Sequence, residues 1–184
     1  GRAMSGTEKE SSHRDHIEAA EGINAIGFAI ITLSDTRTEA TDKSGACLRD
    51  AIEAAGHVVA RYQVVSDDPG AITEALDAAL SDSSVGVVIT TGGTGISARD
   101  SAYETISSRL DKRLDGFGEL FRMLSFEEIG AAAMLSRAVG GIAMGRPLFA
   151  LPGSTAAVRL GIQQLILPQV GHLHHELPRH ATGA

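Results

Sequence analysis

The sequence predicts a three-layer α/β domain in which helices cover both faces of a mostly parallel, doubly wound sheet. Runs of β-branched and apolar residues at 26–33, 58–65 and 85–89 alternate with helical patterns. Such alternation is typical of parallel strands joined by right-handed crossovers. Two later apolar runs, at 139–144 and 148–151, are separated by a Gly-Arg-Pro turn and predict a short antiparallel element.

Length and composition favour a single domain, and the net charge limits the classes of partner that the protein can bind. The 184 residues are 43% hydrophobic and 4% aromatic, so the core must consist mainly of Val, Ile, Leu and Ala. A net charge of −7 argues against nucleic acid held on a general basic surface. One Cys excludes an internal disulfide and favours the cytoplasm. No apolar run approaches the length of a membrane span, so no membrane partner is expected.

Both ends of the chain are expected to lie outside this domain. Residues 1–22 are polar and charged, which predicts a disordered leader, and the residues before Met4 resemble a cloning remnant. The α/β domain is expected over residues 23–178, with a tail at 179–184. The histidines near both ends lack the spacing of a metal site and are expected to be structural or solvated: His13, His16, His172, His174, His175 and His180.

The first half of the chain shows two amphipathic helices between its strands. After the strand at 26–33, one helical face carries Leu48, Ile52 and Ala55. After the strand at 58–65, a second helix begins near Pro69 and has its apolar face at Ile72, Ala75, Leu76, Ala79 and Leu80. Asp67 and Asp68 precede this helix, and one of them is expected to cap it.

The second half is less regular. Residues 101–110 predict a short helix, and residues 111–118 predict an irregular charged crossing. Residues 117–129 have helical spacing, and core is favoured over a subunit contact for the face formed by Leu120, Phe121, Leu124 and Ile129. Ser154 is expected to cap a last helix that ends at Pro168.

The stretch VGVVITTGGTGISARD at residues 85–100 is the strongest local signal. A buried strand runs directly into Gly92, Gly93, Thr94 and Gly95, and the charged pair Arg99 and Asp100 follows. Glycines tolerate positive φ and place no Cβ in the way of a close ligand, and successive N–H groups in such a turn can face one anion. A bare strand-to-helix turn is the simpler alternative, but it would not need three glycines.

Four polar loops are expected to meet at one edge of the sheet. The carboxyl ends of parallel strands lie together, and open α/β sheets bind their ligands there. The loops are at residues 34–37, 66–68, 92–100 and 152–154.

The glycine loop also matches, formally, a dinucleotide fingerprint. Gly93, Gly95 and Ala98 fit G-x-G-x-x-A, and Asp115 lies near the expected acidic position. That fingerprint belongs after the first strand of a unit, whereas here it follows the third. An NAD-dependent oxidoreductase is therefore disfavoured, and no P-loop or nucleophile elbow is present.

Together, four motifs make the chain resemble the MoaB/MogA family of molybdenum cofactor biosynthesis proteins. They are TTGGTG followed by RD, SDT after the first strand, SDD after the second and a late LPGS. The likeness covers about residues 25–177, and LILPQVGHL is closer to the MoaB branch. The resemblance implies a domain that binds molybdopterin and adenylylates it with ATP and Mg²⁺. It also implies a trimer or hexamer that works beside other molybdenum cofactor biosynthesis proteins.

The resemblance assigns site residues by motif. The acid that ends the glycine motif falls on Asp100, and the acid after the second strand falls on Asp67, with Asp68 one place away. Asp67 and Asp100 are thus the expected catalytic pair and Mg²⁺ ligands. The expected substrate- and phosphate-binding residues are Ser34, Asp35, Lys43, Gly92, Gly93, Thr94, Gly95, Arg99, Pro152, Gly153 and Ser154.

Two points stay open at this stage. Arg99 or Lys43 could supply positive charge to phosphates, or Arg99 could pair with Asp100 as a structural bridge. The chain also departs from the family pattern, with SAYET at 101–105 where VTPEA is usual and no Lys or Asn soon after Ser154. These departures keep open a non-catalytic molybdopterin-binding or assembly protein.

Overall fold

The computed structural model describes residues 25–177. The expected leader with His13 and His16, and the tail with His180, lie outside these residues. Within them, no helix is both long enough and apolar enough to span a membrane.

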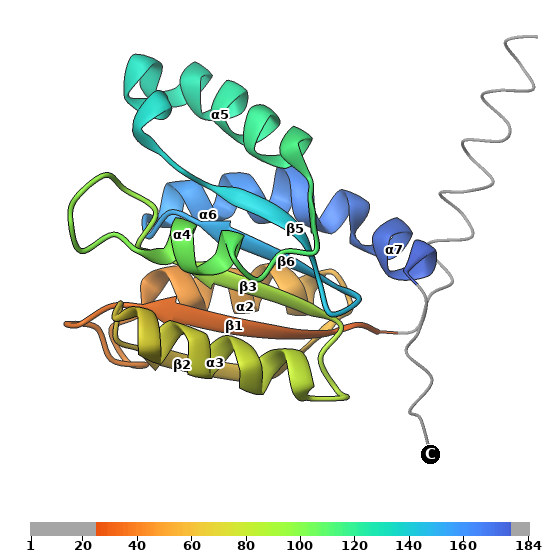
Figure 1. Ribbon diagram of the computed structural model, residues 1–184. Helices are drawn as coiled ribbons and strands as arrows, with labels where there is room; N and C mark the ends of the chain where they lie inside the picture. Colours follow the sequence, from red (N-terminus) through yellow and green to blue (C-terminus); the bar gives the residue numbers. More distant parts are fainter. Residues whose placement is uncertain (1–24, 178–184) are drawn as a thin grey trace, which may run out of the picture.

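A six-stranded sheet with the order β2-β1-β3-β6-β5-β4 runs through the middle of the domain (Figure 1). The strands β1, β2, β3 and β6 are parallel, whereas β5 is antiparallel to β6 and β4 to β5. This confirms the mostly parallel, doubly wound sheet with a short antiparallel element. The strands are β1 (Gly27–Leu33), β2 (Val58–Val65), β3 (Val87–Thr91), β4 (Lys112–Arg113), β5 (Val139–Ala143) and β6 (Arg146–Leu151).

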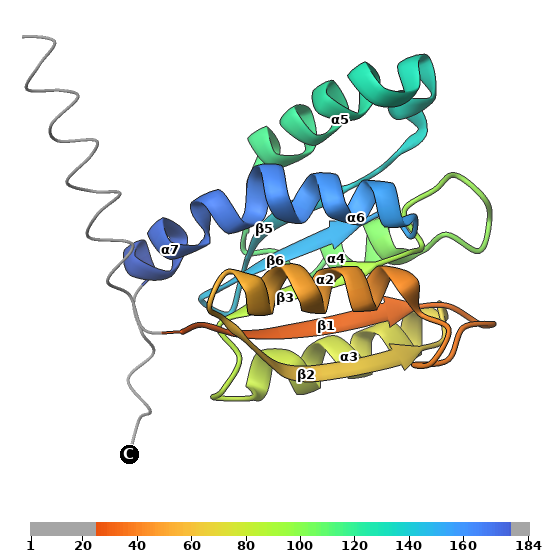
Figure 2. The same ribbon diagram turned by 180° about the vertical axis from the view of Figure 1, so that it is seen from behind.

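Helices cover both faces of the sheet and complete the three layers (Figures 1 and 2). The helices α2, α5, α6 and α7 share one apolar layer, and α3 and α4 share the other. The helical segments are α2 (Lys43–Ala54), α3 (Pro69–Ser81), α4 (Ala102–Ser107), α5 (Asp115–Ile129), η1 (Gly130–Leu135), α6 (Thr155–Gly161), η2 (Ile162–Ile166) and α7 (Leu167–Glu176).

Strand β1 contributes side chains to both apolar layers, because successive side chains of a strand point to opposite faces of the sheet. Phe28 and Ile30 pack in the layer that contains Leu48 of α2, and Ile31 packs in the layer that contains Leu76 of α3. All five side chains are at most 1% exposed. A continuous apolar run is therefore what this central strand requires.

Side-chain caps begin three of the helices. Asp42 accepts a hydrogen bond from N of Gly45 at 3.0 Å, at the start of α2. Asp68 accepts bonds from N of Gly70 at 3.0 Å and N of Ala71 at 3.2 Å, at the start of α3. Ser154 accepts one from N of Ala157 at 3.2 Å. The capping acid of the Asp67–Asp68 pair is thus Asp68.

Three expectations for the second half were wrong in detail. The crossing at 111–118 contains β4, whose two residues pair with Ile142 and Gly141, and α5 already begins at Asp115. The short helix α4 covers only Ala102–Ser107 of the expected 101–110. On α5, Leu120 and Ile129 are 46% and 59% exposed, because Phe117 and Phe121 form the buried contact with the sheet instead.

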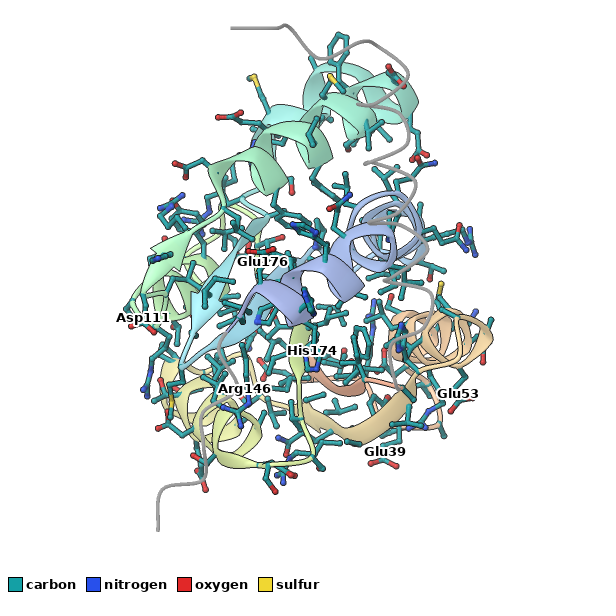
Figure 3. All side chains as sticks on the ribbon, turned by 90° about the vertical axis from the view of Figure 1, so that its right-hand side faces the viewer. Glu39, Glu53, Asp111, Arg146, His174 and Glu176 are labelled. Atoms are coloured by element: carbon teal, nitrogen blue, oxygen red, sulfur yellow. The ribbon has the colours of Figure 1, made fainter. Side chains whose placement is uncertain are left out.

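Pro168 does not end the last helix, contrary to the expectation. The five residues of η2 form a π-helical turn, and Pro168 lies in the first turn of α7, which continues to Glu176. Proline is tolerated there because its missing N–H is not needed at the start of a helical segment. The continued helix carries His174 over the amino end of the sheet, where its Cε1 would lie 3.3 Å from a Cβ at Gly86 (Figure 3).

Candidate functional site

The carboxyl ends of the four parallel strands meet at the edge on the left of Figure 1. Backbone hydrogen bonds tie the ends in pairs: N of Ser34 donates to O of Val65, and N of Gly92 donates to O of Leu151, each at 2.9 Å. The loops that leave these ends therefore start side by side. The strand order reverses between β1 and β3, which is the position where open α/β sheets bind ligands.

The glycines of the 92–95 loop are required by the protein's own packing. Gly92 and Gly93 have φ of 101° and 69°, in the left-handed region that favours glycine. A Cβ at Gly92 would lie 2.5 Å from O of Leu33, and one at Gly93 would lie 3.0 Å from Cβ of Ala102. The loop can adopt this conformation only with glycine at both positions.

Four successive amides of this loop remain available to a ligand. Among residues 25–177, the N–H groups of Gly93, Thr94, Gly95 and Ile96 make no hydrogen bond to another protein group. The next amide, N of Ser97, donates to Oδ2 of Asp100 at 3.0 Å. A row of unpaired amides in a turn forms a concave anion-binding site. The glycine loop thus offers four amide donors to an anion.

Asp67 and Asp100 belong to loops that are tied together. Oγ of Ser101 donates to the backbone O of Asp67 at 3.0 Å, which joins the loop after β2 to the loop after β3. Oδ2 of Asp100 lies against the glycine loop, 2.6 Å from where a Cβ of Gly95 would be. Its Oδ1 has no partner among the described residues.

Arg99 pairs with the acids of two other loops and not with Asp100, so a structural Arg99–Asp100 bridge is absent from residues 25–177. Its guanidinium contacts the carboxylate of Asp35, and Nη2 lies 3.8 Å from Oδ1 of Asp67. Ser66 donates to Asp35 at 2.9 Å. Arg99 itself is 73% exposed, whereas Asp35 and Asp67 are 30% and 24% exposed.

The loop at 152–154 packs against the glycine loop. O of Gly153 accepts bonds from Oγ of Ser44 at 2.7 Å and from Nη1 of Arg37 at 3.2 Å. O of Pro152 accepts one from Oγ1 of Thr91 at 2.9 Å. Cα of Gly92 would lie 3.4 Å from a Cβ at Gly153, so the two loops are in close contact there.

Ser34 and Lys43 contribute less to this arrangement. Oγ of Ser34 accepts bonds from the N–H groups of Thr36 and Arg37, at 3.2 and 3.0 Å, and so shapes its own loop. Lys43 lies exposed at the first position of α2, and its side chain pairs with no other group in the described part of the chain.

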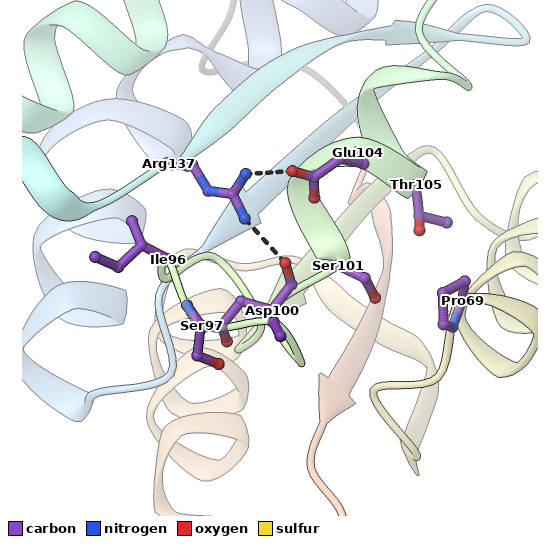
Figure 4. A pocket seen from close by; sticks show the side chains of 9 residues that line it. Pro69, Ile96, Ser97, Asp100, Ser101, Glu104, Thr105 and Arg137 are labelled. Atoms are coloured by element: carbon purple, nitrogen blue, oxygen red, sulfur yellow. Dashed lines mark hydrogen bonds and ion pairs between the residues drawn. The ribbon is translucent and has the colours of Figure 1, made fainter.

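A cavity of about 620 Å³ opens beside the glycine loop (Figure 4). Its walls include Pro69 at the start of α3, Ser97 and Asp100 of the glycine loop, Glu104 of α4, and Arg137. Asp100 is thus at the wall of a hollow large enough for a small molecule, whereas Asp67 does not line it.

Arg137 is a residue of this site that the sequence analysis missed. Its backbone N donates to O of Thr94 at 3.0 Å, and its side chain bonds to O of Gly95 and to O of Asp100, each at 2.9 Å. It also pairs with Glu104, and this hydrogen bond is the main cause that lowers the pKa of the Glu104 carboxyl. One signal was available: Arg137 is the only charged residue between Glu128 and Arg146.

A second missed residue is Asp42, which is 2% exposed. Besides capping α2, its carboxylate accepts hydrogen bonds from Thr32 of β1, at 2.6 Å, and from the hydroxyl of Tyr62 of β2. Burial and the bond to Asp42 raise the pKa of Tyr62. Nη1 of Arg37 lies 3.9 Å from this carboxylate. Asp42 therefore fixes the start of α2 and the 34–42 loop against two strands.

The carboxylates of this site could hold a cation only together with a bound ligand that supplies further oxygens. Among residues 25–177, no group of three or more His, Cys, Asp or Glu side chains could hold a metal ion. Asp67 and Asp100 offer carboxylate oxygens, which suit Mg²⁺, but Mg²⁺ is usually bound by one or two carboxylates plus phosphates and water. The unpaired amides of the same loop as Asp100 are donors that such phosphates could accept from.

Comparisons with known proteins show which family the chain resembles. A family described as "Probable molybdopterin binding domain" matches residues 29–172. The chain is 52% identical over 151 residues to molybdenum cofactor biosynthesis protein B of Bacillus cereus, which covers 82% of this chain and 89% of that protein. It is 48% identical over 158 residues to the protein of the same name from Halalkalibacterium halodurans, with 85% and 93% covered.

Comparison with solved structures indicates the same family. A crystal structure of molybdenum cofactor biosynthesis protein B matches with a TM-score of 0.82 at 49% identity, over 83% of this chain and 96% of that one. The tungsten cofactor synthesizing protein MoaB from Pyrococcus furiosus matches with a TM-score of 0.76 at 37% identity, over 85% and 99%. The chain therefore belongs to the MoaB/MogA family of molybdenum cofactor biosynthesis proteins, closer to its MoaB branch.

Proposed function

We propose that this protein binds molybdopterin and transfers AMP from Mg-ATP to its terminal phosphate, with release of pyrophosphate. One observation carries the proposal: the unpaired amides of Gly93, Thr94, Gly95 and Ile96 lie in the same loop as Asp100, and Ser101 ties this loop to the one that contains Asp67. Amides in a turn bind phosphate oxygens, and carboxylates hold the cation that accompanies them.

In this reaction an oxygen of the pterin phosphate attacks the α-phosphorus of ATP. The new P–O bond forms as the bond to the β-phosphate breaks, and pyrophosphate leaves. Both reactants are anionic, so alignment and charge neutralisation dominate the barrier. No strong base is needed, because the attacking phosphate oxygen is already deprotonated at neutral pH.

Each loop has a role in this proposal. The amides of the glycine loop hold phosphate oxygens, and Ser154 with Gly153 does the same for the second substrate. Asp67 and Asp100 would hold Mg²⁺, which neutralises phosphate charge when bound. Arg99, released from Asp35 and Asp67, would face phosphates, and Ser34 and Lys43 would bind substrate at the same edge of the sheet.

The substitution Asp100→Asn tests the proposal. Asn retains an oxygen that can accept the bond from N of Ser97, so the loop should keep its shape, but the negative charge is lost. We expect pyrophosphate release from ATP with molybdopterin to fall at least about a hundredfold, while molybdopterin binding changes little. Asp68→Asn is the matched control, because Asp68 only caps α3. Equal loss of binding and turnover would contradict a cation-holding role for Asp100.

A non-catalytic molybdopterin-binding or assembly protein is the second candidate. The observation that favours it is the pairing of Arg99 with Asp35 and Asp67, which neutralises one of the two acids that the reaction needs. A wild-type protein that binds molybdopterin but releases no pyrophosphate from Mg-ATP would support this candidate over the first.

We also propose that the protein works as a homo-oligomer, a trimer or a hexamer. The support is an exposed apolar face on α5 and η1. Its side chains are between 46% and 77% exposed: Leu120, Met123, Phe126, Ile129, Met134 and Leu135. Large exposed apolar side chains gathered on two consecutive helical segments are typical of a protein interface.

A further inference from the structure

Arg137 is the residue that fixes the shape of the glycine loop. Its backbone N–H and its side chain together bind three carbonyl oxygens of that loop, those of Thr94, Gly95 and Asp100. A flexible glycine-rich segment is thereby held at both of its ends by one residue, which lies 42 positions after Gly95 in the chain. No other side chain in the described residues binds more than one carbonyl of this loop.

These bonds decide where the free amides point. In a trans peptide, the C=O of one residue and the N–H of the next point in opposite directions, and residues 25–177 contain no cis peptide. Because the carbonyls of Thr94 and Gly95 face Arg137, the amides of Gly95 and Ile96 must face away from it. Arg137 therefore sets the direction of two of the four unpaired amides without having to touch the ligand: its backbone N–H sets that of Gly95, and its guanidinium sets that of Ile96.

The guanidinium of Arg137 is itself held by two neighbours, Glu104 and Tyr103. Glu104 of α4 pairs with Nη1, and the ring of Tyr103 lies 5.2 Å from the guanidinium carbon (Figure 4 shows the bonds to Glu104 and Asp100). Arg113 also lies over this ring, at 5.7 Å, but its hydrogen bonds go to Tyr103 and Asp115. Arg137 and Arg113 thus share one aromatic partner, and only Arg137 reaches the loop.

We infer that Arg137 is a positioning residue that orients the amides of the 92–97 loop toward the phosphate groups of the substrate. This inference rests on the proposed function, because it gives the loop a phosphate ligand. A planar fork can bind the carbonyls of Gly95 and Asp100 together, whereas the single ammonium of lysine cannot replace it. Preorganised donors of this kind depend on the residues that support them.

Inorganic pyrophosphate, titrated into the full chain and followed by amide NMR, tests the inference. In the wild-type protein the shifts should be concentrated on the amides of residues 93–96. Arg137→Gln should weaken pyrophosphate binding about tenfold or more and should disperse those shifts. Arg113→Gln removes the same charge and a contact with the same ring, and it should bind pyrophosphate like the wild type.

Arg137→Lys separates positioning from charge. It keeps the positive charge, so binding that equals the wild type would show that charge alone acts and would overturn the inference. Arg137→Gln binding within twofold of the wild type, or a wild type whose loop amides do not shift, would also overturn it. Failure of the proposed function is distinguishable: a wild type that binds pyrophosphate at this loop but releases none from ATP with molybdopterin refutes adenylyl transfer and leaves the role of Arg137 standing.

Discussion

Arg99 and Asp67 form an ion pair across two loops, with Nη2 of Arg99 3.8 Å from Oδ1 of Asp67. The same guanidinium contacts Asp35. A single exposed arginine therefore neutralises two acids at the carboxyl edge of the sheet, next to the unpaired amides of the glycine loop. A divalent cation that bound Asp67 would compete with this arginine for the same oxygens.

Arg99→Ala should strengthen cation binding and weaken turnover at once. Without the arginine, Asp35 and Asp67 lose their neutralising charge, so Mn²⁺ affinity should rise about fivefold or more, the effect of ~1 kcal/mol between unit charges near 4 Å in water. Adenylyl transfer should fall, because a positive charge for the phosphates is lost. Electron paramagnetic resonance of Mn²⁺ and pyrophosphate release measure the two effects.

The control for Arg99 is another arginine–aspartate pair. Arg109 lies 2.8 Å from Asp77, between α4 and α3, and Arg109→Ala should change neither Mn²⁺ affinity nor turnover. Both variants should keep a free energy of unfolding within about 0.5 kcal/mol of the wild type, as is usual for exposed ion pairs. Mn²⁺ affinity that stayed constant in Arg99→Ala would show that Arg99 does not compete for the acids.

Phe126→Glu should dissociate the proposed oligomer. Phe126 is 60% exposed on the apolar face of α5 and η1, so a charge there costs little in the isolated chain but is unfavourable in an interface. Light scattering should give a mass close to the 19.1 kDa of one chain. Val58→Glu changes an apolar residue that is 51% exposed outside this face, and it should leave the mass of the wild type unaltered.

Asp42→Ala should destabilise the fold more than any exposed change at this edge. It leaves the hydroxyls of Thr32 and Tyr62 without their acceptor and removes the cap of α2. Each buried unpaired group costs about 1–3 kcal/mol and a lost cap about 1 kcal/mol, so a loss of about 3 kcal/mol or more is expected in urea unfolding. Asp50→Ala, on the exposed side of the same helix, should be nearly neutral. Similar losses in the two variants would mean that the network contributes little.

The helices and strands that the sequence predicted best are those whose hydrophobic pattern follows from packing in or against the sheet. β1 and β3 are buried on both faces, so their runs of apolar residues are unbroken, and Ile72, Leu76 and Leu80 repeat at helical spacing because α3 covers one face. The gathering of the polar loops at one edge follows from parallel strands alone.

The features that could not be predicted from the sequence depend on contacts between residues far apart in the chain. The two residues of β4 carry no strand pattern, and β5 supplies their pairing. Adjacency in the sequence offered Asp100 as one of two alternatives for Arg99, whereas its partner Asp35 lies 64 positions away. Leu120 and Ile129 were expected in the core because an apolar helix face has the same sequence pattern whether it packs on a sheet or stays exposed.

The last prediction concerns acid stability and His57, at the amino end of β2. Nδ1 of His57 accepts a hydrogen bond from N of Ile26 at 3.0 Å, and the ring lies 5.5 Å from that of Phe28. Burial first, and the nearby His174 second, lower the pKa of His57 below its usual 6.5. Protonation at Nδ1 would break the bond from Ile26, so the fold favours the neutral ring.

The sign of the effect follows from proton binding. As the pH falls below 6.5, the unfolded chain binds the proton before the folded protein does, so the free energy of unfolding decreases until the pH passes the lowered pKa of the folded state. His57→Asn keeps an oxygen acceptor near Nδ1 but cannot titrate, and its urea midpoint should depend less on pH between 7.5 and 5.5. His172→Asn, exposed on α7, should retain the pH dependence of the wild type. An unchanged slope in His57→Asn would assign the acid sensitivity to another group.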